Sequence, residues 1–102
     1  MPLNSKWHPL AEGAVEGVPA VLGVYELGDR NREVVYIGGS DADIREALRH
    51  HMHTAPMDVK RFRILTSIHG VPQAVVHGHV RRFLRRNRRL PKYQDSINVP
   101  VT

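Results

Sequence analysis

The chain has 102 residues, enough for one domain of ordinary size, and we expect residues 1–102 to form a single domain. It contains no cysteine, which excludes disulfides, cysteine-based zinc sites and thiol catalysis. There is no apolar run long enough to span a membrane, which takes about 18 residues. The first ten residues also lack the apolar segment of a secretory signal, so we expect a cytoplasmic protein with no membrane partner.

Positive charge is concentrated near the C-terminus. Residues 80–92 contain seven of the 15 cations and no acid: Arg81, Arg82, Arg85, Arg86, Arg88, Arg89 and Lys92. Subtracting these seven charges from the net charge of +5 leaves −2 for the rest of the chain. A basic element on a nearly neutral protein indicates a polyanionic partner, because phosphate contacts release counterions.

The first half of the chain predicts a hairpin. Residues 10–18 predict a short helix, which two glycines weaken. Residues 22–27 and 33–38 are rich in β-branched and aromatic residues, and a polar loop of hairpin length separates them. This pattern predicts two antiparallel strands.

A helix is expected directly after the hairpin. Ser40 or Asp41 suits its N-cap. The spacing of Ile44, Ala47, Leu48 and His51 places these four residues on one helical face.

The second half adds a strand and a helix. Residues 59–66 alternate in part and predict a third strand with one polar face. Pro72 suits the first position of a helix that reaches residue 88. The apolar stripe expected on this helix consists of Val76, Val80, Phe83 and Leu84. The element order predicts the α/β (α+β) class, with a small three-stranded, mostly antiparallel sheet flanked by helices.

Two tripeptides on the predicted hairpin carry the most specific signal. The sequence reads GVY at 23–25 and, ten residues later, YIG at 36–38, with Gly23 and Gly38 as the motif glycines. This arrangement resembles the GIY-YIG nuclease superfamily, and the resemblance extends over about residues 19–94. It implies a GIY-YIG-like fold.

The resemblance also implies a set of catalytic positions. Tyr25 and Tyr36 match the two motif tyrosines, one of which helps to activate or orient the attacking water in members that cleave DNA. His51 matches a His or Tyr at the end of the first helix. An Arg of that helix stabilises the transition-state charge, and a Glu of a later helix holds a divalent metal, Mg²⁺ or Mn²⁺. The implied partner is nucleic acid, with DNA favoured over RNA.

Three positions depart from the family pattern. The position of the catalytic Arg falls on Ala47 or on Glu46, depending on one inserted residue, so Arg45 and Arg49 are the nearest candidates to stabilise charge. Gln94 stands where related sequences often have Asn.

The metal-binding Glu is the third departure. No acid occurs between Asp58 and Asp95, so the second helix cannot supply one. The residues that could stand at the position of this Glu are Val80, His77 and His79. Of their side chains only imidazole can bind a metal, and it suits transition metals better than magnesium. His77 and His79 are the candidate metal ligands there, although residues two apart on a helix face different ways.

The combined pattern predicts a nucleic-acid-binding domain whose nuclease chemistry is weakened or lost. The candidate phosphate-binding residues lie on the third strand and in the basic segment: Arg61, Arg63, Arg81, Arg82, Arg85, Arg86, Arg88, Arg89 and Lys92. One alternative is an active endonuclease that depends on a divalent metal and uses Tyr25, Tyr36 and either Arg45 or Arg49. Another is a protein-interaction module whose basic helix binds an acidic partner.

Overall fold

A four-stranded antiparallel sheet forms the centre of the molecule in the computed structural model, which describes residues 6–94. The strands are β1 (His8–Pro9), β2 (Gly23–Gly28), β3 (Val34–Ser40) and β4 (Arg61–Leu65), in the order β1-β4-β2-β3. The predicted α/β class and the three predicted strands are confirmed. The sheet has one strand more than expected, because His8 pairs with Phe62 at its edge. A two-residue strand that contains proline has no alternation to reveal it, and proline is tolerated at a sheet edge.

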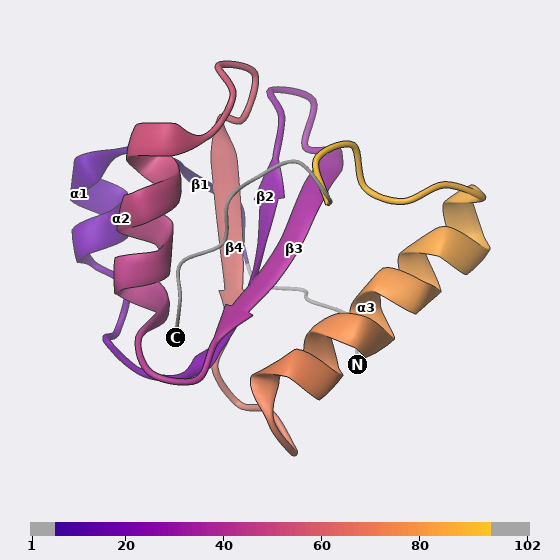
Figure 1. The fold of residues 1–102 in the computed structure, drawn as a ribbon. Coiled ribbons are helices and arrows are strands. Elements are labelled where there is room, and N and C mark those ends of the chain that lie inside the picture. The colour runs from indigo at the N-terminus through magenta and orange to yellow at the C-terminus, as the bar shows by residue number, and fades with distance from the viewer. Residues whose placement is uncertain (1–5, 95–102) are drawn as a thin grey trace.

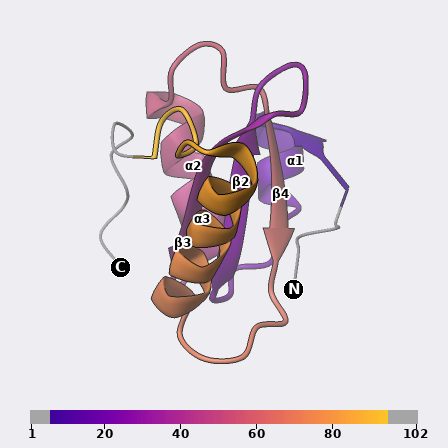
Figure 2. The same cartoon turned by 90° about the vertical axis from the view of Figure 1, so that its right-hand side faces the viewer.

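Helices cover both faces of this sheet. The helices α1 (Glu12–Glu16) and α2 (Ile44–Thr54) lie on one face, and α3 (Pro72–Asn87) lies on the other (Figure 1). Figure 2 looks onto the face that α3 covers and shows this helix running along the strands. No helix among residues 6–94 is long and apolar enough to cross a membrane.

The register of the hairpin decides which side chains face which helices. Tyr25 pairs with Gly38, and Leu27 pairs with Tyr36. Because neighbouring side chains of a strand point to opposite faces, Tyr25, Leu27 and Tyr36 lie together on one face. They pack in the buried core with residues of α2. Glu26, which lies between them in sequence, points to the α3 side, where it lines a cavity with residues of that helix.

Helix α2 buries the predicted face and begins later than expected. Ile44, Leu48 and His51 are all buried. The N-cap is Asp43, whose carboxylate accepts a hydrogen bond from the Glu46 N–H, rather than Ser40 or Asp41. The Ser40 hydroxyl instead accepts hydrogen bonds from the backbone of the turn between β3 and α2.

Helix α3 begins at Pro72, as predicted, but its apolar stripe differs in part from the prediction. Leu84 is 43% exposed, whereas His79 is buried. The cause is the course of the helix, whose C-terminal half diverges from the sheet (Figure 1). The helix ends where Arg88 adopts a left-handed conformation (φ 59°) and its N–H bonds to the Leu84 carbonyl.

The chain after α3 covers part of the open edge of β3. The Gln94 side chain accepts a hydrogen bond from the Ile37 N–H (2.9 Å) and donates one to the Ile37 carbonyl (2.7 Å). The Tyr93 N–H donates to the Val35 carbonyl at 2.8 Å. These bonds satisfy backbone groups that an edge strand would otherwise expose.

Replacing Gln94 should therefore destabilise the fold. Gln94→Ala leaves the half-buried N–H and carbonyl of Ile37 without this partner, and we expect a loss of about 1–3 kcal/mol in the free energy of unfolding. Urea unfolding followed by circular dichroism measures this loss. Gln73→Ala, at an exposed position of α3, is the matched control. Equal midpoints for the two variants would contradict the role assigned to Gln94.

Candidate functional site

Three of the predicted site residues meet beneath α2. The Tyr25 hydroxyl lies 2.7 Å from Nε2 of His51 in a buried hydrogen bond. The ring centroids are 6.3 Å apart for Tyr25 and Tyr36, and 5.2 Å apart for Tyr36 and His51. The exposed fractions are 0% for Tyr25, 2% for Tyr36 and 0% for His51. We call these three residues the tyrosine cluster.

The two motif glycines allow close approaches to this part of the sheet. A Cβ on Gly38 would lie 2.7 Å from the Tyr25 hydroxyl oxygen and 2.7 Å from a ring carbon of Tyr36. A Cβ on Gly23 would lie 2.8 Å from the Leu65 carbonyl oxygen of β4. All three distances are too short for a side chain, so glycine is required at both positions for packing.

Burial keeps the tyrosine cluster uncharged. Desolvation raises the pKa of Tyr25 well above its ordinary value and raises that of Tyr36 to about 12. Burial, with a smaller contribution from His50, lowers the pKa of His51 to about 4. Near neutral pH the cluster therefore consists of two phenols and a neutral imidazole. The His51 Nδ1 atom is buried and has no hydrogen-bond partner among residues 6–94.

The two candidate arginines of α2 make their hydrogen bonds elsewhere. The Arg45 Nε donates to the Val18 carbonyl at 2.6 Å. Arg49 forms an ion pair with Glu16 of α1 at 2.9 Å and another with Glu46. The contacts with Glu16 and Val18 fasten α2 to α1 and to the chain after α1, whereas the pair with Glu46 lies within α2. Neither arginine bonds to the tyrosine cluster.

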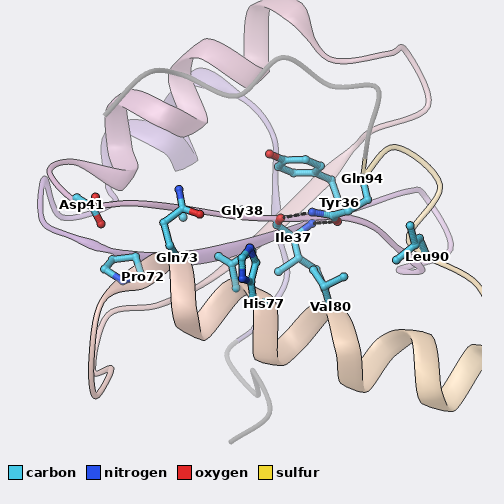
Figure 3. A pocket seen from close by; sticks show the side chains of 12 residues that line it. Tyr36, Ile37, Gly38, Asp41, Pro72, Gln73, His77, Val80, Leu90 and Gln94 are labelled. Carbon is cyan, nitrogen blue, oxygen red and sulfur yellow. Dashed lines mark hydrogen bonds between the residues drawn. The ribbon is translucent and has the colours of Figure 1, made fainter.

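A cavity of about 390 Å³ lies next to Tyr36, between β3, α3 and the chain after α3 (Figure 3). Its polar side chains include Asp41, Gln73, His77 and Gln94. Asp41 and Gln73 were not expected at the site, since their signals in the sequence are an ordinary turn and an ordinary helix start. Figure 3 shows Tyr36 pointing away from α3.

The residues of this cavity do not fit the divalent metal that the resemblance implies. Of the three candidates on α3, Val80 and His77 line the cavity, whereas His79 lines a different one. Asp41 is the only carboxylate among the lining residues. Within residues 6–94 no three His, Asp or Glu side chains are grouped closely enough to hold a metal ion. Magnesium and manganese prefer several oxygen ligands, which this set does not provide.

Helix α3 and the turn after it present unpaired positive charge. The exposed side chains without an acidic partner within 4.0 Å among residues 6–94 are Arg81, Arg82, Arg85, Arg86 and Arg88. Arg89 lies 3.9 Å from Glu33, and Lys92 lies 2.9 Å from Asp58. Five of the seven predicted cations of this segment thus have no acidic partner in the part of the chain that the structure describes.

The predicted arginines of β4 are less free. The Nε atom of Arg63 lies 2.7 Å from Glu26, and its guanidinium group lies 4.3 Å from the centre of a Trp7 ring. Arg61 donates to the Arg30 carbonyl at 3.5 Å. Glu26 and Trp7 were not expected as partners, although Glu26 lies opposite Arg63 in the register of β2 and β4.

The tyrosine cluster predicts a defined pH dependence of stability. The folded-state pKa of His51, about 4, lies below the ordinary value of 6.5, so the unfolded chain binds more protons between these pH values. The contribution of His51 to the free energy of unfolding should be fully present above pH 6.5. It should fall by about 3 kcal/mol as the pH drops to 4. Urea unfolding across this range should show a flatter profile for His51→Gln. His53→Gln, on the exposed side of the same helix, is the control. Parallel profiles for wild type and His51→Gln would refute the assignment.

Comparisons with known proteins identify distant relatives. The chain is 23% identical over 82 residues to UvrABC system protein C of Dichelobacter nodosus. This match covers 80% of this chain and 13% of that protein. It is 22% identical over 89 residues to the protein of the same name from Haemophilus ducreyi and 21% identical over 99 residues to that of Rickettsia bellii. These matches cover 87% and 97% of this chain, and 14% and 15% of the relatives. The chain therefore spans less than a sixth of the length of each.

A family model covers most of the chain, including both tripeptides of the hairpin. The model is described as a domain of unknown function (DUF7508), and it matches residues 1–81. The chain belongs to this family.

Proposed function

We propose that this chain is a nucleic-acid-binding domain of the GIY-YIG type, which binds phosphates through α3 and does not cleave them. The observation that carries the proposal is the set of five exposed arginines on α3 and its C-terminal turn that have no acidic partner within residues 6–94. Arginine suits phosphate because its fork of donors matches two phosphate oxygens.

The position of this charge supports an extended anionic partner. Like charges four residues apart on a helix repel each other, as Arg81 and Arg85 do on α3. No acid occurs on the helix to relieve this repulsion. A nucleic-acid backbone supplies regularly spaced negative charge and gains entropy from released counterions. The similarity to UvrABC system protein C over nearly the whole chain supports the GIY-YIG assignment and favours DNA over RNA.

The state of the tyrosine cluster supports binding over cleavage. The Tyr25 hydroxyl already bonds to His51. The rings of Tyr25 and Tyr36 are both buried and are therefore inaccessible to a substrate. Burial raises the pKa of both phenols, which disfavours a phenolate that could act as a base. Arg45 and Arg49 are engaged with Val18 and Glu16. The tyrosine cluster then acts as core, holding β2, β3 and α2 together.

Binding should depend on salt in proportion to the phosphates contacted. Five arginines lack an acidic partner within residues 6–94. A plot of log K against log salt concentration for a short DNA duplex should therefore have a negative slope whose magnitude is at most about 5. Arg85→Ala should reduce the magnitude of this slope by about 1. Fluorescence anisotropy of labelled DNA measures both values. Lys60→Ala removes one exposed charge outside α3 and should leave the slope unchanged. Absence of binding at ~0.1 M salt would overturn the proposal and leave the acidic protein partner as the alternative.

Cleavage is tested separately from binding. Supercoiled plasmid incubated with the protein and Mg²⁺ or Mn²⁺ should stay intact, because the cavity beside Tyr36 offers one carboxylate and the tyrosine cluster is closed. Agarose electrophoresis detects a single nick per plasmid. Nicking that is lost in Tyr36→Phe would show instead that the domain is an active endonuclease with an unusual site.

A further inference from the structure

A second cavity, of about 240 Å³, lies on the opposite face of the sheet from the tyrosine cluster. Residues of α3 line one side of it, and residues of β2, β3 and β4 line the other. Its charged lining residues are Glu26, Arg63, Arg82 and Arg86, and Phe83 and Asn87 lie beside them. We call it the arginine groove. Most of the α3 residues that line it belong to the C-terminal half of this helix.

One guanidinium group in this groove is held in place before any ligand arrives. Arg63 is fixed by its ion pair with Glu26 (2.7 Å) and by the ring of Trp7 (4.3 Å). Its side chain is 22% exposed, which is low for an arginine on a sheet face. Only its Nε atom bonds to another residue within 6–94, so its two terminal nitrogens keep their donors for a ligand. A fixed guanidinium loses little conformational entropy on binding.

Two further arginines line the same groove from α3. Arg82 and Arg86 are four residues apart, so they lie on one side of the helix. Neither has an acidic partner within 4.0 Å among residues 6–94. The three arginines and Glu26 give the groove a formal charge of +2. An anion between them would relieve the repulsion between Arg82 and Arg86.

The size of the groove limits what it can hold. Pockets for drug-sized ligands measure about 300–1,000 Å³, so this one suits a small group. Three guanidinium groups around such a space match the oxygens of one phosphate. We propose that the arginine groove binds a single phosphate of a nucleic-acid backbone, held by Arg63, Arg82 and Arg86. This assignment rests on the proposed function and adds a fixed point at which the backbone is seated.

The chain offers a matched pair of variants to test this site. Arg82→Ala with Arg86→Ala removes two groove arginines, whereas Arg81→Ala with Arg85→Ala removes two that are absent from the groove lining. Both pairs are four residues apart on α3 and lower the net charge equally. The variant that lacks Arg82 and Arg86 should bind duplex DNA about tenfold more weakly than the matched variant, which corresponds to one charge-assisted contact.

Trp7 provides a second readout, because it is the only tryptophan and stacks on Arg63. Adding unlabelled duplex DNA should change its fluorescence in the wild type and in the Arg81/Arg85 variant, but much less in the Arg82/Arg86 variant at matched saturation. Circular dichroism confirms that the variants fold. Equal losses of affinity in both variants would reject the groove and leave the proposed function standing. Full affinity in both variants, or no binding by the wild type, would reject the proposed function itself.

Glu26 allows a test with the opposite sign. Glu26→Gln keeps a hydrogen-bonding group next to Arg63 and raises the formal charge of the groove by one. DNA affinity should therefore increase severalfold, whereas Glu12→Gln, an exposed change on α1, should have a smaller effect. An equal increase in the two variants would indicate a general charge effect and count against the groove.

Discussion

The pairing of Tyr25 with Gly38 determines how the rest of this domain is arranged. Because the side chains of a strand alternate, this register puts both motif tyrosines on the α2 face. It puts Glu26 and Ile37 on the α3 face, together with Arg63 from β4. A shift by one residue would bury the carboxylate of Glu26 under α2 and expose the tyrosines. The core and the basic surface are therefore consequences of one hairpin register, although they lie on opposite faces.

On the α2 face, the register leads to a closed site. Gly38 has no side chain, which lets the Tyr25 hydroxyl and the Tyr36 ring occupy the space above it. This packing brings the Tyr25 hydroxyl to His51 and removes water from all three side chains. Burial then favours the neutral form of each group. The same dense packing that stabilises the domain thus opposes the charged intermediates that proton transfer to or from these phenols would require.

Much of this arrangement could be predicted from the sequence, because it follows from periodicity. The spacing of Ile44, Ala47, Leu48 and His51 identified the buried face of α2, and the two tripeptides identified the hairpin. The contacts made by Gln94 with Ile37 and by Arg63 with Trp7 could not be predicted. They join residues more than 50 positions apart, and no local pattern encodes such a pairing. The exposure of Leu84 was also unexpected, since periodicity cannot show where a helix leaves its sheet.

The absence of acidic residues between Asp58 and Asp95 affects the charge of α3. With no Asp or Glu between Asp58 and Asp95, α3 can be neutralised within residues 6–94 only by acids from the first part of the chain. Those within ion-pair distance of the arginines beyond α2 are Glu26, which holds Arg63, and Glu33, which lies 3.9 Å from Arg89. Neither of these arginines lies on α3 itself, so within residues 6–94 the charge of α3 is left to solvent ions or a ligand. Releasing those ions to a phosphate backbone gains free energy, whereas a carboxylate on α3 would have served a metal and reduced this gain. The phosphate binding that we propose rests on this distribution of charge.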